Sequence, residues 1–401
     1  MNTQRPLEGI TVLDFTRIYS GPYCSMLLGD LGAYVIKVEK KGTGDDSRQF
    51  RPKPNIKEGS GYTMYLNRNK KSVELDLKDE TARGIIYRLC EKADIVLENY
   101  APGVAKKLGI DYDTLKKYNP QIIYGSISGF GQTGPYRNKA AYDIIAQAMG
   151  GYMAVTGPKN GMPIKLGTSV GDSCAGLHMA FALMAAMYYR QRTGIGQYID
   201  ISMMDSVFAT LENHVMIQTM DHITPVRNGN SNQNAVPFNT FRTSDDYVAI
   251  AVANDALFEK FAQAIQRLDL LENPDYKTTN NRKLHEDELT KIVEEWTTKH
   301  TTKEVCQIFE DYKIPVGPIL GINQLVEDPH ILAREMMIEV DHPYGGKIRM
   351  PGCPIKFSET KIDHFAPSSA LGADTAQVLR EIGGYTQKEL EDLAEAGIIP
   401  R

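Results

Sequence analysis

The chain has 401 residues, of which 42% are hydrophobic and 24% charged, a composition ordinary for a globular protein of more than one domain. The formal net charge of −5 argues against a general attraction to nucleic acid or to an anionic membrane, so local cations and backbone N–H groups must hold any anionic ligand. Five scattered cysteines without a CxxC pair, and eight histidines without HExxH spacing, argue against disulfide and zinc frameworks. The start lacks signal-peptide features and the apolar run 175–189 is too short to span a membrane, so we expect a cytoplasmic protein. The missing ligand spacing leads us to expect no bound metal.

Strand and helix patterns alternate through the first part of the chain. Helical patterns occupy 22–32 and 79–93, the second with Asp79 as its N-cap. The β-rich runs are 10–15, 33–39, 72–77, 94–100 and 121–128. This alternation predicts a parallel sheet with crossover helices, in which ligands bind beyond the carboxyl ends of the strands.

The later part of the chain contains a second unit. A buried helix is expected at 174–191, closed by Gly194, then a strand at 197–202 and a helix at 203–218. An Asn-, Gly- and Pro-rich loop at 224–239 follows. New strand and helix patterns then appear, including a capping box of Thr301 and Glu304. The predicted domains are a large α/β domain beginning at 1–225, a small domain at 226–325, and a return segment at 326–401 that completes the large one.

The sequence signatures of several common catalytic and nucleotide-binding sites are not matched in this chain. GFGQTG at 129–134 matches GxGxxG, but Pro135 stands where a helix should open, so a glycine-rich turn is the better interpretation. Neither a P-loop nor a GxSxG motif occurs. Lys37, Lys40 and Lys41 flank GTGDD at a strand end, where an anion site and a solvated loop are equally compatible with the composition.

Asp172 lies in SVGDSCAG, just before the long apolar run. One interpretation is a helix N-cap, which stabilises a helix by roughly 1 kcal/mol. The other is a nucleophile, since Gly171 and Ser173 leave the carboxylate accessible and helix-start N–H groups can bind an oxygen that becomes negative. The residues alone leave both open.

Several stretches, in this order, resemble the class III CoA-transferases, relatives of formyl-CoA transferase and carnitine CoA-transferase. They include YLNRNKKSVELDLKDE, ADIVLENYAPGVAKKLG, NPQIIYGSISGFGQTGPY, VGDSCAG and RTGIGQYIDISMMDS, and the resemblance spans essentially the whole chain. It implies that Asp172 attacks the thioester of an acyl-CoA to form a mixed anhydride. The CoA thiolate then returns to give an aspartyl-CoA thioester, and the incoming acid reverses these steps.

The resemblance also implies site residues. CoA contacts fall on Tyr19, Lys40, Lys78, Asn99, Tyr100 and Lys107. The substrate pocket falls on Tyr62, Tyr142, Asp143 and the small-domain loop residue Gly229. Lys40 and Lys107 replace arginines, so bidentate phosphate contacts become point charges. Tyr19 stands where formyl-CoA transferase has a glutamine, and the glycine-rich loop of that enzyme is replaced by VRNGNSNQNAVPFN.

The fold that the resemblance implies is a Rossmann-like large domain with a smaller α+β domain, in an interlocked homodimer. The expected substrates are coenzyme A and acyl-CoA, with no tightly bound cofactor. We expect transfer of CoA from acetyl-CoA or succinyl-CoA to a small organic carboxylic acid. The alternatives are an α-methylacyl-CoA racemase-like enzyme, for which Tyr142 would be a poor base in place of histidine, and a non-catalytic acyl-CoA-binding protein.

Overall fold

The computed structural model describes residues 5–52 and 59–401, and the chain forms two compact units. The larger unit contains Met1–Tyr152, Leu166–Val215 and His330–Arg401, and the smaller contains Met153–Lys165 and Met216–Pro329. The smaller unit thus includes the predicted 226–325 region, begins earlier, and takes in a segment from before the long apolar helix.

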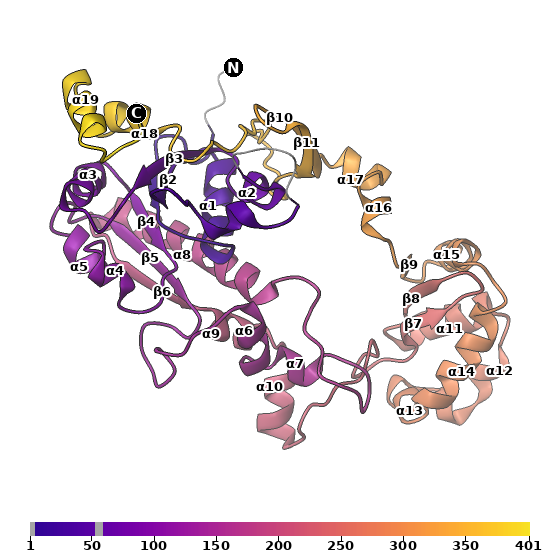
Figure 1. The fold of residues 1–401 in the computed structure, drawn as a ribbon. Coiled ribbons are helices and arrows are strands. Elements are labelled where there is room, and N and C mark those ends of the chain that lie inside the picture. The colour runs from indigo at the N-terminus through magenta and orange to yellow at the C-terminus, as the bar shows by residue number, and fades with distance from the viewer. Residues whose placement is uncertain (1–4, 53–58) are drawn as a thin grey trace. The chain divides into compact units, whose positions relative to one another are not determined.

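A parallel sheet is the centre of the larger unit (Figure 1). Its six strands run in the order β3-β2-β1-β4-β5-β6, and every neighbouring pair is parallel. The strands are β1 (Thr11–Asp14), β2 (Tyr34–Lys40), β3 (Lys70–Leu75), β4 (Ile95–Glu98), β5 (Ile123–Ser128) and β6 (Tyr198–Ser202). The chain order reverses between β1 and β4, and in doubly wound sheets such a point is where ligands bind.

The β-rich runs are nearly continuous because both faces of this sheet are covered by helices. Val12 packs in one apolar cluster with Leu28, Met179 and other residues, while its neighbour Leu13 packs in a second cluster on the other face. The helices of the larger unit are α1 (Ser20–Asp30), α2 (Gly61–Leu66), α3 (Glu80–Cys90), α4 (Val104–Lys107), α5 (Tyr112–Leu115), α6 (Asp143–Met149), α8 (Val170–Thr193) and α9 (Met203–Ala209), with the 3-10 turn η1 (Asp46–Gln49). Helices α7 (Tyr152–Val155) and α10 (His214–Met216) lie at the unit boundaries.

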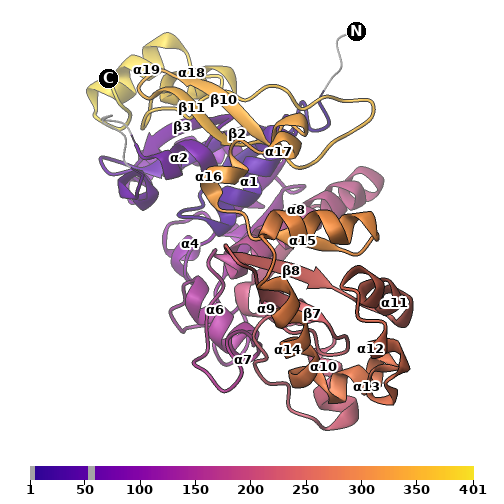
Figure 2. The same cartoon turned by 90° about the vertical axis from the view of Figure 1, so that its right-hand side faces the viewer.

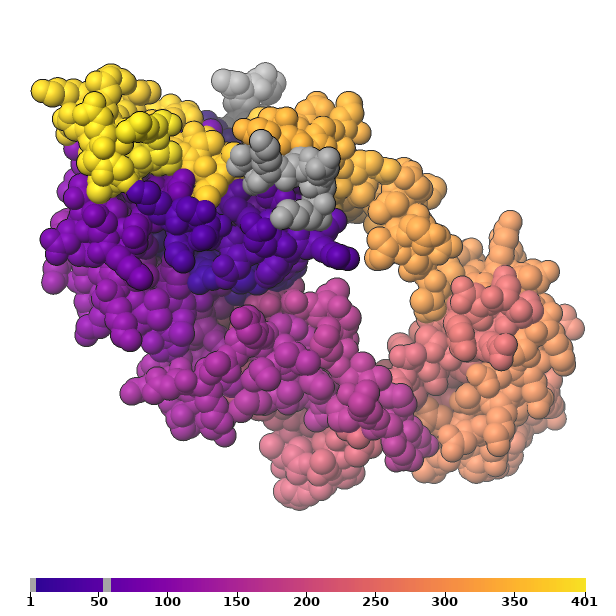
Figure 3. Space-filling view, viewed as in Figure 1, coloured from indigo at the N-terminus to yellow at the C-terminus, as the bar shows by residue number. Residues whose placement is uncertain are grey.

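The C-terminal segment returns to the larger unit and covers the open edge of β3 (Figures 1 and 2). Asp374 accepts the backbone N–H of Ser72 at 2.8 Å, and Thr375 accepts that of Glu74 at 3.1 Å. Figure 3 shows these last residues in yellow, packed over the indigo and purple start of the chain. The elements are α17 (Pro329–Ala333), the hairpin β10 (Met337–His342) and β11 (Gly346–Pro351), α18 (Thr375–Glu381) and α19 (Gln387–Glu395).

The smaller unit has a three-stranded antiparallel sheet in the order β7-β8-β9, covered by helices around Phe241, Phe261 and Phe309. Its strands are β7 (Phe238–Arg242), β8 (Tyr247–Ala251) and β9 (Val316–Pro318). Its helices are η2 (Ile217–Asp221), α11 (Asp255–Ala264), α12 (Asp269–Glu272), η3 (Pro274–Tyr276), α13 (Thr279–Leu284), α14 (Glu286–Thr297), α15 (Thr302–Asp311) and α16 (Ile322–Leu325).

Three of the predicted helix boundaries agree with the structure, and one predicted helix does not. Asp79 caps α3, Gly194 ends α8 at φ 73°, and the Thr301–Glu304 capping box forms, so these three predictions are confirmed. The single helix expected at 203–218 is wrong, because the backbone leaves the right-handed region at Glu212 (φ 52°) and separates α9 from α10.

Helix α8 is long and apolar enough to cross a membrane by length and composition, which the core helix of a globular protein can also be. It packs against α1, α9 and β5, and its Met179 and Leu183 are buried in the apolar cluster under the sheet. These contacts place α8 among the packed helices of the larger unit.

Candidate active site

A cavity of about 260 Å³ lies at the carboxyl ends of β1, β2 and β3. Cationic groups reach it from Arg17, Lys40 and Lys78, while Leu75, Leu77, Val104 and Leu108 give it an apolar wall. Carboxylates also line it, from Glu39, Asp45, Asp46 and Asp76. A cavity with cations beside an apolar wall at this edge of the sheet fits a ligand that joins phosphates to less polar groups.

The predicted CoA residues divide into two groups. Lys40, Lys78 and Tyr100 line the cavity. Lys107 ends α4, whose first residue lines the cavity, and its side chain is exposed and not part of the lining. Asn99 points elsewhere: its amide accepts the N–H of Arg17 at 2.7 Å and donates to the Arg17 carbonyl at 2.8 Å, so it fixes backbone. Tyr19, the sixth predicted CoA residue, contacts Ser173 beside Asp172, and direct contact with CoA stays a prediction for all six.

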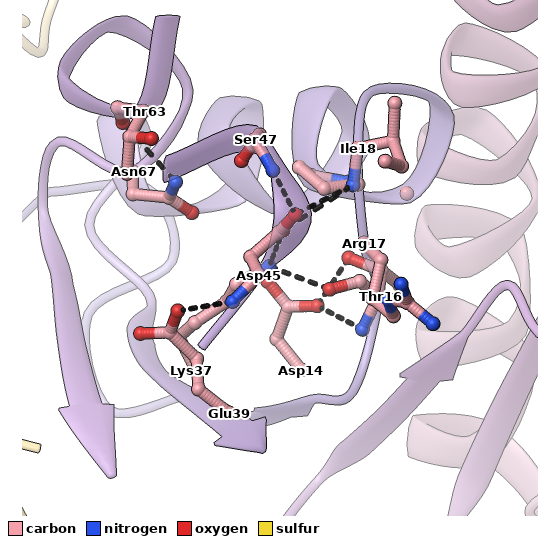
Figure 4. Close-up of polar contacts among 12 residues, drawn as sticks. Asp14, Thr16, Arg17, Ile18, Lys37, Glu39, Asp45, Ser47, Thr63 and Asn67 are labelled. Carbon is pink, nitrogen blue, oxygen red and sulfur yellow. Dashed lines mark hydrogen bonds and ion pairs between the residues drawn. The ribbon is translucent and has the colours of Figure 1, made fainter. Parts of the chain in front are cut away.

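Beneath the cavity lies a buried charge network (Figure 4). Lys37 donates to Asp45 at 2.9 Å and to the Thr16 carbonyl at 2.5 Å, and both charged side chains are almost fully buried. Burial alone would raise the pKa of Asp45, but Lys37 and the N–H groups of Ser47 and Ile18 hold it well below its ordinary value. From its position in the sequence, Lys37 was a possible contact for a bound anion. The structure shows it instead in a buried ion pair with Asp45.

A second buried pair adjoins the first. Asp14 accepts from Thr16, from Ser25 at 2.5 Å and from Lys70 at 3.2 Å. Burial opposes ionisation of Asp14, but Lys70 and Lys37 outweigh it and lower its pKa. Burial disfavours the charged ammonium of Lys70 and lowers its pKa to about 8, although the Asp14 carboxylate acts to raise it.

Asp172 is the third residue of α8, and Ser169 occupies the N-cap position without a side-chain capping bond, so the N-cap interpretation of Asp172 is wrong. The side chain is partly buried, and its pKa is raised to about 7. Burial is the main cause, the neighbouring Asp143 carboxylate adds to it, and a hydrogen bond from Ser20 opposes it. A carboxylate of this basicity is a stronger nucleophile than an ordinary aspartate once it is ionised.

The side chain of Asp143, which is the first residue of α6, lies against the N-terminus of α8. Its Oδ1 accepts the N–H groups of Gly171 at 2.8 Å and Asp172 at 3.4 Å, while its Oδ2 accepts from the fully buried Gln147 at 2.7 Å. Gln147 in turn accepts the N–H of Leu166 at 2.9 Å. The N–H groups expected at this helix start for an oxygen of the substrate are therefore already bonded to Asp143.

Two predicted aromatic residues meet near Asp172. The rings of Tyr19 and Tyr62 lie 6.1 Å apart, and the Tyr19 hydroxyl accepts from Ser173 at 3.4 Å. Burial raises the pKa of Tyr62, and the Tyr19 and Asp172 groups add to that rise. Tyr142 is different: it precedes Asp143 at the start of α6 and is 76% exposed, so it is not part of this cluster.

Gly229 belongs to the smaller unit. It has a φ of 63°, which glycine adopts without strain, and its N–H donates to the carbonyl of Gly157 at 2.9 Å. This contact joins the two chain segments of that unit. Its part in a substrate pocket stays a prediction.

Sequence reasoning missed Arg17, Ser20 and Asp45. Arg17 and Asp45 line the cavity, and Ser20 hydrogen-bonds Asp172. The available signal was position, because Arg17 and Ser20 follow the first strand where the carboxyl end of the sheet lies. In the parts of the chain that the structure describes, no group of three His, Cys, Asp or Glu is placed to hold a metal ion.

The parallel doubly wound sheet, the cavity of mixed charge at its carboxyl edge and the carboxylate at the start of α8 define a class of α/β proteins that bind their ligands at the carboxyl ends of the strands. A family model for CoA-transferase family III matches residues 7–375. The chain belongs to that family and is a family III CoA-transferase.

Individual relatives agree with this assignment. The chain is 36% identical to succinyl-CoA:glutarate CoA-transferase of Homo sapiens, over 100% of this chain and 91% of that protein. It is 35% identical to succinate--glutarate CoA-transferase of Agrobacterium fabrum, over 95% of this chain and 96% of that one. Among solved structures, a CAIB/BAIF family protein from Brucella suis superposes with a TM-score of 0.84 at 35% identity, covering 94% of this chain and all of that chain.

Proposed function

We propose that this enzyme transfers CoA from succinyl-CoA to a small dicarboxylic acid such as glutarate, with Asp172 carrying the CoA as an aspartyl thioester. The names of these two relatives pair succinyl-CoA or succinate with glutarate, and the identity to them extends over nearly the whole chain. The observation that carries the covalent step is Asp172 itself, a carboxylate with a pKa of about 7 beside Tyr19 and Tyr62. Acetyl-CoA remains the other donor to test.

In the first half-reaction, the ionised Asp172 carboxylate attacks the thioester carbonyl carbon, the C–S bond breaks and the CoA thiolate leaves. The thiolate then attacks the aspartyl carbonyl of the mixed anhydride, which releases the donor acid as its carboxylate and leaves CoA on Asp172. The acceptor carboxylate repeats both steps in reverse. No proton is consumed overall, and the thioester bond is conserved.

The hydrogen-bond donors for the developing oxyanion are expected to be hydroxyl groups. Asp143 already accepts the free N–H groups of the first turn of α8. The Tyr19 hydroxyl lies beside Ser173, one residue from Asp172. A phenol held there can donate to the carbonyl oxygen as it becomes negative.

We also propose the interlocked homodimer of a Rossmann-like domain and a smaller α+β domain. Its support is the apolar stripe of α8, where Leu177, Phe181 and Tyr188 follow one another at intervals of one and two helical turns and are 49%, 78% and 62% exposed. Such a stripe is a typical protein contact surface. Native mass spectrometry should give a dimer, and a monomer would contradict this part of the proposal.

Intact mass spectrometry tests the covalent step. The protein is incubated with succinyl-CoA, trapped with borohydride or hydroxylamine, and mapped by peptide analysis, with Asp172→Ala in parallel. We expect an adduct on Asp172 that the variant lacks, and its turnover by glutarate. An adduct on another residue, or none with either donor, would overturn the mechanism.

A further inference from the structure

The turn Thr16–Ser20 joins the cavity to Asp172. Thr16 and Arg17 line the cavity, the Tyr19 hydroxyl contacts Ser173, and the Ser20 hydroxyl hydrogen-bonds Asp172. A displacement of this short turn would therefore move groups on both sides of the proposed reaction.

The turn is held in a strained conformation. Ile18 has a φ of 67°, in the left-handed region that β-branched residues avoid. Backbone strain of this kind persists only where the surrounding contacts impose it. The contacts that impose it are hydrogen bonds to the backbone of the turn itself.

Asp45 supplies the bond at the strained residue. The Ile18 N–H donates to both carboxylate oxygens of Asp45, each at 3.2 Å (Figure 4). Lys37 bonds Asp45 and also the Thr16 carbonyl, so one buried ion pair holds the turn on both sides of Arg17. Asn99 holds Arg17 between them.

Asp45 is itself fixed and cannot follow a moving turn. Its carboxylate accepts the N–H of Ser47 at 2.9 Å, and its own N–H donates to the buried Glu39 at 3.0 Å. Glu39 is paired with Arg48 at 2.7 Å. The anchor of the turn is thus part of a rigid network on β2 and η1.

From this arrangement we infer that Asp45 is a positioning residue, which holds the Thr16–Ser20 turn so that Tyr19 and Ser20 stand at Asp172. The inference rests on the proposed function for its catalytic consequence, while its structural content stands alone. Asp45 acts through Ile18 and does not itself contact the reacting atoms.

The first test measures the turn directly. Hydrogen–deuterium exchange of a peptide covering residues 16–20 is compared in the native chain, in Asp45→Asn and in Asp30→Asn. Asp30 forms another fully buried ion pair, with Arg68 at 2.6 Å, and is the matched control for loss of a buried charge. We expect exchange in this peptide to rise about tenfold in Asp45→Asn and to be unchanged in Asp30→Asn. Equal exchange in all three proteins would overturn the inference.

The second test measures catalysis. In single-turnover experiments at saturating succinyl-CoA, where a change in CoA affinity no longer affects the rate, we expect Asp45→Asn to form the Asp172 adduct about 100-fold more slowly. An adduct rate within about threefold of the native rate at saturation would overturn the positioning role. If the native chain forms no adduct, the proposed function fails, and the exchange experiment still decides the role of Asp45.

A rescue variant separates positioning from general destabilisation. Ile18→Gly removes the steric objection to a φ of 67°, because glycine adopts this conformation freely. We expect Asp45→Asn to slow the adduct by less than about tenfold in the Ile18→Gly background. An equally large loss in both backgrounds would contradict the inference.

Discussion

Two carboxylates of the larger unit, Asp45 and Asp172, have opposite chemistry. Asp45 faces the ammonium of Lys37 at 2.9 Å, and its pKa is lowered. Asp172 faces the carboxylate of Asp143, and its pKa is raised to about 7. Burial pushes both pKa values upward, so the charge of the partner decides the outcome. The paired carboxylate holds backbone in place, and the one that faces a like charge is left basic and available to react.

The strongest test of this difference removes the reactive carboxylate. We expect Asp172→Ala to lower kcat for CoA transfer by about 10⁴-fold or more, because alanine has no carboxylate to carry the CoA. CoA affinity should stay within about threefold, since Asp172 does not line the cavity. Steady-state kinetics with succinyl-CoA and glutarate, with isothermal titration of CoA, measure both. A variant that keeps a tenth of the native kcat would contradict the assignment.

The paired carboxylate should matter for stability instead. Lys37→Met leaves Asp45 buried without its cation, and we expect the free energy of unfolding to fall by about 3–5 kcal/mol in urea titrations at pH 7. Because the folded pKa of Asp45 is depressed, its contribution is present above pH ~4 and is lost as the pH falls below that value. The variant should therefore lose this acid-dependent part. A loss below about 1 kcal/mol at pH 7 would show that the pair contributes little.

Replacing Asp172 should have the opposite effect on stability. Its folded pKa of about 7 lies above the unfolded value of ~3.9, so its ionisation destabilises the fold progressively as the pH rises from 4 to 7. We expect Asp172→Asn to raise the free energy of unfolding at pH 8 by about 1–3 kcal/mol, and to leave it unchanged at pH 4. Urea titrations at the two pH values decide this. An effect that is the same at both would assign it to packing.

The smallest expected effect isolates the partner charge. Asp143→Asn keeps an oxygen for the N–H of Gly171 but removes the like charge beside Asp172. The midpoint of the pH dependence of adduct formation should fall by about 1 unit, because burial still raises the pKa. Single-turnover rates between pH 5 and pH 9 measure the midpoint. If it does not move, burial alone sets the pKa of Asp172.

The sequence predicted the parallel sheet well, because strands buried on both faces read as continuous apolar runs such as 94–100. The family resemblance assigned Lys40, Lys78 and Tyr100 to CoA, and all three line the cavity: Lys40 ends β2, and the other two lie just beyond the carboxyl ends of β3 and β4. The position of a residue in a strand pattern therefore carries much of the information about this edge of the sheet.

The sequence could not distinguish a ligand contact from an internal one. Lys37 and Lys40 belong to the same strand, yet Lys37 is buried against Asp45 while Lys40 is exposed. Asn99 precedes Tyr100, yet it bonds backbone and Tyr100 lines the cavity. These differences depend on which partner arrives from distant parts of the chain, as Asp143 does at the start of α8, and local pattern does not contain that information.

The edge of β3 can be covered only after the C-terminal segment has been synthesised. Ser72 of this edge strand is bonded by Asp374, which is synthesised 302 residues later. During that interval the growing chain presents an open strand edge, the part of a sheet that pairs most readily with another chain. The C-terminal segment therefore also protects the edge of β3 from pairing with another chain. A chain truncated before Asp374 would leave this edge exposed.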